Sequence, residues 1–280
     1  MVLEFTKMHG AGNDYIYFDC FKQKIENPNE LSVALSDRHF SIGGDGIVMI
    51  CPSDVADAKM RMFNIDGSEG KMCGNAIRCV AKFLYDKGIC KKDKISIETL
   101  SGIKYLDLTV ENGKVTQVTV DMGKAILNPK EIPVNFDGET AIKRKAVIDG
   151  KEYTVTCVSM GNPHCVVFDD VDPDDIDLHN IGPKFEKNEL FPEQVNTEFV
   201  KVIDDKTLKM RVWERGSGET LACGTGACAT VVAAVENGYC KKGETVKVIL
   251  TGGELFIKYT DETVFMTGPA AIAFEGSVEY

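Results

Sequence analysis

The chain repeats itself at an offset of 150 residues, and this repeat limits the possible folds more than any other feature. Over positions 60–102, eleven of 43 residues are identical to the residue 150 positions later, whereas composition alone would give about two or three. The identical pairs are Met60/Met210, Arg61/Arg211, Glu69/Glu219, Cys73/Cys223, Gly74/Gly224, Gly88/Gly238, Cys90/Cys240, Lys91/Lys241, Lys92/Lys242, Leu100/Leu250 and Gly102/Gly252. The period is too long for a solenoid, so it predicts two equivalent domains.

Each copy of the repeat is predicted to consist mainly of strands around one helix. Residues 115–120 and 246–250 have the residue types and alternation of strands, and Asn112-Gly113 is a hairpin signal. A helix is expected just after each Cys-Gly pair. In the first copy its apolar residues recur at helical spacing before Gly88, and in the second copy residues 227–235 are almost wholly apolar before Gly238. The second helix should therefore be deeply buried.

The domain boundary is expected near residues 121–133, where Gly123, Asn128-Pro129 and Pro133 interrupt the strand pattern. This places an N-terminal domain carrying Cys73 at 1–124 and a C-terminal domain carrying Cys223 at 125–268. The last strand, about 269–280, could cross back to the N-terminal domain. The expected picture is a sheet wrapped around a central helix, formed twice, with the helix N-termini exposed.

The net charge of the chain limits the classes of molecule that it is expected to bind. A formal net charge of −11 argues against nucleic acid, which favours a basic surface, and against adsorption to an anionic membrane. No stretch reaches the roughly 18 apolar residues of a spanning helix. The first residues, 1–5, lack the basic and apolar parts of a signal peptide. We therefore expect a cytoplasmic protein that binds a small molecule.

Ten cysteines raise the possibility of a disulfide scaffold or a zinc site. A disulfide scaffold is disfavoured, because the chain is long and carries no secretion signal. Zinc is disfavoured because no C-x2-C pair occurs and only four histidines are present. Most of the cysteines are expected to be small buried side chains, so the question is which of them are not.

Cys73 and Cys223 are distinguished by their place at a predicted helix start and by their equivalence in the repeat. A thiol at a helix N-terminus faces the positive end of the helix dipole and unpaired backbone N–H groups, which lowers its pKa. The same N–H groups bind carboxylates. A cysteine before glycine in one helix is more often structural, but most other positions diverged between the two copies and these did not. Two such thiols, one on each wall of a cleft, would suit proton removal from one face of a carbon and return to the other. Cys90 and Cys240, beyond the helix ends, look structural.

Five stretches of the chain resemble diaminopimelate epimerase. They are KMHGAGNDY (7–15), MRMFNIDGSEGKMCGNAIRC (60–79), VSMGNPHCVVF (158–168), FPEQVNTEF (191–199) and VWERGSGETLACGTGACA (212–229). Their order and separation extend the resemblance over nearly the whole chain. It implies an α+β fold of two pseudo-symmetric domains, each a curved, mainly antiparallel sheet or barrel around a central helix.

The implied activity is that of an isomerase interconverting LL- and meso-2,6-diaminopimelate, on the route to lysine and cell-wall precursor, without a cofactor. The resemblance also implies a homodimer. Cys73 and Cys223 match the two acid/base thiols, and His164 and Glu214 match positions that assist them. The positions matching substrate contacts are Asn13, Asn64, Gly74, Asn75, Asn162, Asn196, Glu214, Arg215, Gly224 and Thr225. One departure is Gly46, where many members carry a glutamine that contacts the substrate.

Three other functions stay open on the sequence alone. The chain could be a related racemase of another amino acid, of the proline or histidine type. It could be a cysteine-rich metal or redox protein, although the spacing of possible ligands disfavours this. A pyridoxal enzyme would need a Schiff-base lysine and a phosphate cup, for which no persuasive signature is present.

Overall fold

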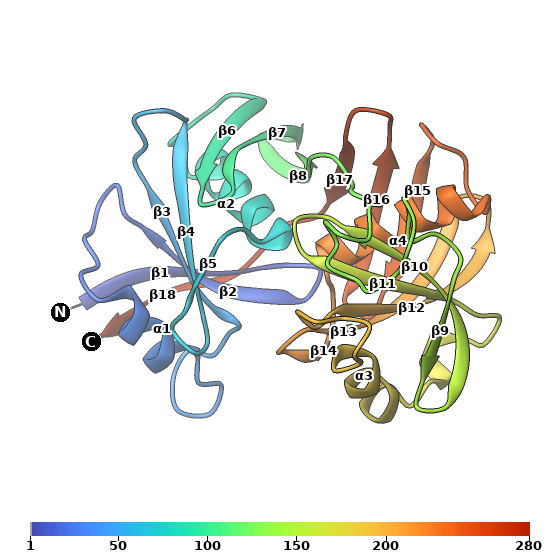
Figure 1. Cartoon of the computed structure of the whole chain (residues 1–280). Coiled ribbons are helices and arrows are strands. Elements are labelled where there is room, and N and C mark those ends of the chain that lie inside the picture. The colour runs from blue at the N-terminus through green and yellow to red at the C-terminus, as the bar shows by residue number, and fades with distance from the viewer. Residues whose placement is uncertain (1) are drawn as a thin grey trace. The chain divides into compact units, whose positions relative to one another are not determined.

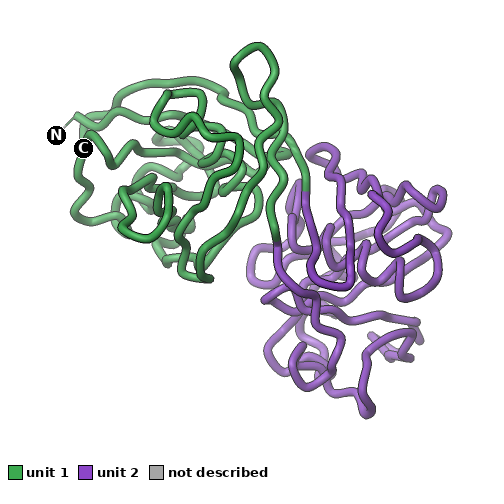
Figure 2. Tube along the Cα trace, turned by 90° about the horizontal axis from the view of Figure 1, so that it is seen from above, with its two compact units in different colours: residues 1–121, 267–280 green, residues 122–266 purple. Residues whose placement is uncertain are grey.

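The computed structural model describes residues 2–280, so Met1, the first residue of the expected N-terminal domain, lies outside it. The chain forms two compact units, coloured separately in Figure 2. Among the described residues, one unit comprises 2–121 together with Thr267–Tyr280, and the other comprises Met122–Met266. We call them unit 1 and unit 2.

Unit 1 contains a mainly antiparallel sheet and two helices (Figure 1). Its elements are β1 (Val2–Gly10), β2 (Asn13–Asp19), α1 (Pro28–Ser36), β3 (Gly46–Cys51), β4 (Ala58–Asn64), β5 (Glu69–Gly70), α2 (Gly74–Asp86), β6 (Lys94–Thr99), β7 (Gly102–Glu111), β8 (Lys114–Asp121) and β18 (Ala271–Glu279). Most neighbouring strands are antiparallel, but β2 pairs parallel with β3 and β4 pairs parallel with β6. The C-terminal strand β18 belongs to this unit because it pairs antiparallel with β1 from Val2/Glu279 onward.

Unit 2 has the same sequence of pairings. Its elements are β9 (Arg144–Ile148), β10 (Lys151–Ser159), β11 (Pro163–Phe168), a short 3-10 helix (Pro173–Asp175), α3 (Leu178–Glu186), β12 (Asn196–Asp204), β13 (Thr207–Glu214), β14 (Gly218–Thr220), α4 (Gly224–Asn237), β15 (Thr245–Leu250) and β16 (Gly253–Tyr259), and β17 (Val264–Gly268) runs across the boundary. The parallel pairs are β11–β12, which is the counterpart of β2–β3, and β13–β15, which is the counterpart of β4–β6.

The repeat is visible in contacts as well as in elements. Helices α1 and α3 begin and end 150 residues apart. The ion pair Arg61–Glu69 in unit 1 has its counterpart in Arg211–Glu219 in unit 2, with N–O distances of 2.7 Å in both. The predicted α+β fold of two pseudo-symmetric halves is therefore confirmed.

Each unit is built around one buried helix. Helix α2 packs against β1, β2, β7 and β8, and α4 packs against six strands of unit 2. Every residue of α4 from Gly226 to Ala234 is buried, as the apolar run predicts. Its small side chains let the surrounding strands approach closely. The helix ends at Gly238 with φ of 85°, a left-handed conformation that glycine adopts without strain.

None of the helices within residues 2–280 is long and apolar enough to span a bilayer. None of the ten cysteines, all of which lie within that range, forms a disulfide.

Candidate active site: two helix-capping cysteines

Cys73 and Cys223 are both the N-caps of the buried helices. Each has extended backbone angles, φ −134° and ψ 122° at Cys73 and φ −114° and ψ 113° at Cys223. Each sulfur accepts a backbone N–H from the first helical turn, from Ala76 at 3.5 Å and from Gly226 at 3.4 Å. The side chain of an N-cap ordinarily does this with oxygen. The repeat therefore places two thiols in the same electrostatic position, at the positive end of a helix.

The partners of Cys73 come from the hairpin between β1 and β2. Its thiol lies 3.4 Å from Oδ1 of Asn13. The amide of Asn13 is in turn oriented by Asp45, whose Oδ2 accepts its Nδ2–H at 2.7 Å. Arg38 holds Asp45 at 2.9 Å. Asp45, in the segment Gly43-Gly44-Asp45-Gly46, is thus linked to Cys73 through Asn13, a contact that sequence reasoning did not foresee.

Gly46 carries no side chain for a steric reason. Its φ is +146°, and a Cβ at this position would lie 2.0 Å from the carbonyl oxygen of Phe63 on the neighbouring strand β4. Real Cβ atoms do not approach an oxygen so closely. The glutamine that many relatives are expected to carry here cannot be accommodated by this backbone.

The environment of Cys223 differs from the expectation of a lowered pKa. Burial raises the pKa of the Cys223 thiol well above its usual value, and the nearby Glu214 and Glu198 carboxylates raise it further. Hydrogen bonds from Thr225 and from the Gly226 N–H act in the opposite direction. Desolvation disfavours the charged thiolate more than the helix terminus favours it. The surroundings of Cys223 in this structure therefore favour the thiol over the thiolate.

Glu214 lies beside Cys223 at the end of β13. Burial raises the pKa of its carboxyl, while hydrogen bonds with Thr220 and Cys223 lower it in part. A carboxyl with a raised pKa next to a thiol is a pattern typical of acid–base sites. The sequence predicts Glu214 as an assisting residue, and the structure places it in contact with Cys223.

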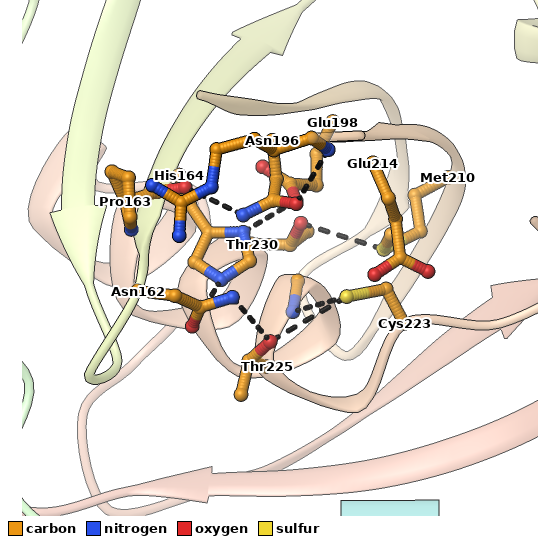
Figure 3. A network of polar contacts seen from close by, with 12 residues as sticks. Asn162, Pro163, His164, Asn196, Glu198, Met210, Glu214, Cys223, Thr225 and Thr230 are labelled. Carbon is orange, nitrogen blue, oxygen red and sulfur yellow. Dashed lines mark hydrogen bonds and ion pairs between the residues drawn. The ribbon is translucent and has the colours of Figure 1, made fainter. Parts of the chain in front are cut away.

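His164 and Asn162 connect to Cys223 by a chain of hydrogen bonds (Figure 3). The Nε2 of His164 lies 3.1 Å from Oδ1 of Asn162, and Nδ2 of Asn162 donates to the hydroxyl of Thr225 at 3.3 Å. That hydroxyl lies 3.5 Å from the sulfur of Cys223. On its other side, His164 meets Glu198 at 2.7 Å, and both side chains are fully buried.

Asn196 links the start of strand β11 to the loop after strand β13. Its Nδ2 donates to the carbonyl of Pro163 at 2.8 Å, and its Oδ1 accepts the backbone N–H of Arg215 at 3.0 Å. The guanidinium of Arg215 reaches the carbonyl of Glu193 at 2.9 Å. Asn196 therefore fixes the loop that presents Arg215.

The remaining predicted residues lie in the first turns of the two buried helices and at the end of one strand. Gly74 and Asn75 form the first turn of α2, and Gly224 and Thr225 form the first turn of α4. Asn64, at the end of β4, turns back onto its own loop and donates to Ser68 at 3.0 Å. Unit 2 thus gathers His164, Asn162, Glu214 and Thr225 around Cys223 into one polar network.

Helix α3 holds the loop that carries Glu214 and Arg215. Glu186, which is 7% exposed, accepts the indole N–H of Trp213 at 2.7 Å and the backbone N–H of Gly216 at 2.9 Å. Gly182 lets the helix approach closely, because a Cβ there would lie 2.3 Å from the Trp213 ring.

The change Glu186→Gln is expected to loosen this loop, because an amide can accept with only one of its two terminal atoms. The loss of one hydrogen bond of about 1 kcal/mol should raise KM roughly fivefold with little change in kcat. Steady-state kinetics on purified protein measure both constants. Glu189→Gln, an exposed change just beyond the same helix, is the matched control. An unchanged KM in Glu186→Gln would show that the loop does not depend on this carboxylate.

Sequence reasoning missed Glu186, Glu198 and Asp45. One signal was available for Glu198, since an acidic residue in the strand stretch Asn196–Val200 is unusual among otherwise uncharged neighbours. No signal marked Glu186, because only the packing of α3 brings it to Trp213.

Comparison with known proteins gives one consistent family. A family model described as diaminopimelate epimerase matches residues 5–128 and 156–273. A diaminopimelate epimerase of Acetivibrio thermocellus is 57% identical over 279 residues, which is 99% of each chain. One from Methanococcus maripaludis is also 57% identical over 279 residues, covering 99% of this chain and 100% of the relative.

Solved structures support the fold alone. A hydroxyproline epimerase from Agrobacterium vitis has a TM-score of 0.71 at 13% identity, covering 99% of this chain and 92% of that one. A Bacillus anthracis protein of the PhzF family has a TM-score of 0.69 at 16% identity, with both chains covered completely.

Proposed function

The chain belongs to the diaminopimelate epimerase family, and on that premise we propose that Cys73 and Cys223 are the acid and base that invert one of its substrate's α-carbons. The protein is an isomerase, and its function is diaminopimelate epimerisation in lysine biosynthesis. The proposed reaction interconverts LL- and meso-2,6-diaminopimelate and needs no cofactor.

The observation that carries this proposal is the matched geometry of the two thiols. Both cap a buried helix, and both sulfurs accept one N–H of its first turn. Removing the α-proton of an amino acid places negative charge on the adjacent carboxylate as the C–H bond breaks. Backbone N–H groups at a helix N-terminus stabilise such a charge, and each unit supplies one such terminus.

In the proposed mechanism, one cysteine acts as a thiolate and the other as a thiol. The thiolate removes the α-proton from one face, and the thiol delivers its own proton to the opposite face. After turnover the protonation states have exchanged, so the reverse direction uses the same groups in opposite roles. The raised pKa of Cys223 supports its assignment as the proton donor in the resting enzyme.

The other residues take supporting roles in this proposal. Glu214 and His164 adjust the ionisation of Cys223. Gly74-Asn75 and Gly224-Thr225 hold the reacting carboxylate with the donors of their helix turns. Asn13, Asn64, Asn162, Asn196 and Arg215 hold the distal amino-acid end of the substrate.

The decisive assay uses LL-diaminopimelate as the substrate of purified protein with no added cofactor. We expect the meso isomer to form, and chiral chromatography measures its formation. Proline and histidine are tested in parallel, because a racemase of either type is the alternative within the same class. Racemisation of proline or histidine with no conversion of diaminopimelate would contradict the proposed substrate. A metal bound stoichiometrically to the purified protein would favour the alternative of a metal or redox protein.

We also propose that the protein is a cytoplasmic homodimer that binds no nucleic acid. Membership of the family supports the assembly, and the net charge of −11 supports the lack of nucleic-acid binding. Sedimentation equilibrium of the purified chain measures its mass. A monomer at micromolar concentration would contradict the dimer.

A further inference from the structure

Glu198 is the group beside this site whose role is unexplained. Its side chain on β12 is fully buried, and its Oε1 lies 2.7 Å from Nδ1 of the fully buried His164. Within residues 2–280, no hydrogen-bond partner reaches its second oxygen, Oε2. A buried carboxylate without a compensating charge or proton is strongly disfavoured. The Glu198–His164 pair is therefore expected to keep a proton between Oε1 and Nδ1 while Nε2 carries another.

The far side of His164 leads to Cys223 through two groups that can each both donate and accept. These are the amide of Asn162 and the hydroxyl of Thr225, linked at 3.1, 3.3 and 3.5 Å (Figure 3). An amide or a hydroxyl that accepts on one side is free to donate on the other. The direction of the first hydrogen bond therefore sets the direction of all those that follow.

Two directions are possible, and they differ by one proton on the pair. With the proton present, Nε2–H donates to Asn162 Oδ1, Asn162 Nδ2 donates to Thr225, and the Thr225 hydroxyl donates to the sulfur of Cys223. With the proton absent, Nδ1–H stays with Glu198 and Nε2 becomes an acceptor. The amide of Asn162 must then turn over, and its oxygen accepts a hydrogen bond from the Thr225 hydroxyl. A thiolate at Cys223 would lose this donor.

We propose that Glu198 is a positioning residue for Cys223, because it keeps the proton on the pair and so directs the Thr225 hydroxyl at the sulfur. The thiolate form of Cys223 is stabilised by that hydrogen bond. This inference rests on the proposed role of Cys223 as an acid and base.

The charge of Glu198 by itself would act in the opposite sense. The pair faces Glu214 of β13, Cys223 of α4 and Cys165 of β11, and the Glu198 carboxylate raises the pKa of both cysteines. It also packs tightly against the start of α4, since a Cβ on Gly226 would lie 2.7 Å from Oε1. We call the chain of hydrogen bonds from Glu198 through His164, Asn162 and Thr225 to Cys223 the relay. The relay favours the thiolate of Cys223, whereas the charge of Glu198 alone disfavours it, and an experiment can separate the two effects.

The test measures alkylation of Cys223 by iodoacetamide as a function of pH, in the full chain without substrate, by mass spectrometry of the peptide that carries it. Glu198→Gln keeps the shape of the side chain. Its amide can accept from Nδ1 or donate to it, so both directions of the relay become possible and the thiolate loses its fixed donor. The relay predicts alkylation slower by roughly three- to tenfold at pH 7, with partial recovery in Glu198→Asp. Faster or unchanged alkylation in Glu198→Gln would overturn the proposal.

A second pair of variants tests whether Glu198 acts through Thr225. Thr225→Val removes the hydroxyl and is expected to slow alkylation by a similar factor, whereas Thr225→Ser keeps the hydroxyl and the rate. In the Thr225→Val background, Glu198→Gln should slow alkylation no further. An equal effect in both backgrounds would overturn the relay. Equal rates in the Thr225→Val and Thr225→Ser variants would also overturn the relay, and this comparison stands even if Glu198→Gln fails to fold, in which case Glu198→Asp replaces it.

These measurements do not depend on the reaction that the enzyme catalyses. Alkylation is followed without substrate, so a different substrate or a different role for Cys223 would leave its outcome unchanged. In epimerase assays of the same variants, Glu198→Gln is expected to lower kcat with little change in KM, because the carboxylate does not touch the substrate.

Discussion

Cys73→Ala and Cys223→Ala are each expected to lower the kcat for epimerisation by about 10²- to 10⁴-fold. Each change removes the group that transfers the proton on one face of the α-carbon, and this range is typical for the loss of a general acid or base. The helix that each cysteine caps is otherwise retained. Steady-state assays on both stereoisomers measure the loss.

A second measurement distinguishes a mechanism that uses two thiols from one that uses a single thiol. Each single variant keeps one thiol, whose thiolate form can still remove an α-proton and return a deuteron from solvent to the same face. In deuterium oxide, Cys73→Ala and Cys223→Ala should therefore exchange the α-hydrogen without inversion, and they should do so on opposite stereoisomers. Exchange can be followed by NMR of the substrate. The control is Cys90→Ala with Cys240→Ala, the other cysteine pair of the repeat, which should keep near-normal kcat. Near-normal epimerisation after loss of either Cys73 or Cys223 would rule out the two-thiol mechanism.

Gly46→Gln, which introduces the glutamine expected from the family resemblance, should destabilise the protein by about 3–4 kcal/mol. Two costs combine, since φ of +146° is unfavourable for a residue with a side chain and the Cβ would lie 2.0 Å from the Phe63 carbonyl oxygen. Backbone strain of this kind alone costs about 1–3 kcal/mol. The melting temperature should fall by roughly 10 °C, as differential scanning calorimetry can measure.

The matched control for Gly46→Gln is Gly102→Gln in the same unit. Gly102 also has a positive φ, +90°, but a Cβ there meets nothing within 4 Å. It should show only the cost of the backbone conformation. If both variants melt at the same temperature, the contact with Phe63 contributes nothing, and the absence of a side chain at position 46 needs another explanation.

Several features of the fold could be predicted from the sequence because they depend on neighbouring residues. The start of each buried helix follows from Cys-Gly and the apolar run behind it, and α2 and α4 begin at Gly74 and Gly224. The repeat predicted that whatever unit 1 forms, unit 2 forms again. The ion pairs Arg61–Glu69 and Arg211–Glu219 follow the same rule.

The candidate site was predictable only in part. The repeat and the family motifs select Cys73 and Cys223 from ten cysteines, and the motifs also name Glu214 and His164. They do not reveal Glu198, because its contact with His164 joins residues 34 positions apart and depends on the parallel register of β11 and β12. The hydrogen bond between Glu186 and the Trp213 indole depends in the same way on how α3 packs against Trp213.

The sequence by itself determined that two equivalent thiols lie at two helix N-termini, since the helix start and the 150-residue period are both local patterns. Only the tertiary structure decided the surroundings of Cys223. The local sequence favours a lowered pKa at both, yet at Cys223 burial together with the Glu214 and Glu198 carboxylates raises it. Desolvation and charge are supplied by side chains that are distant in sequence. They are set by packing, which a local pattern does not specify.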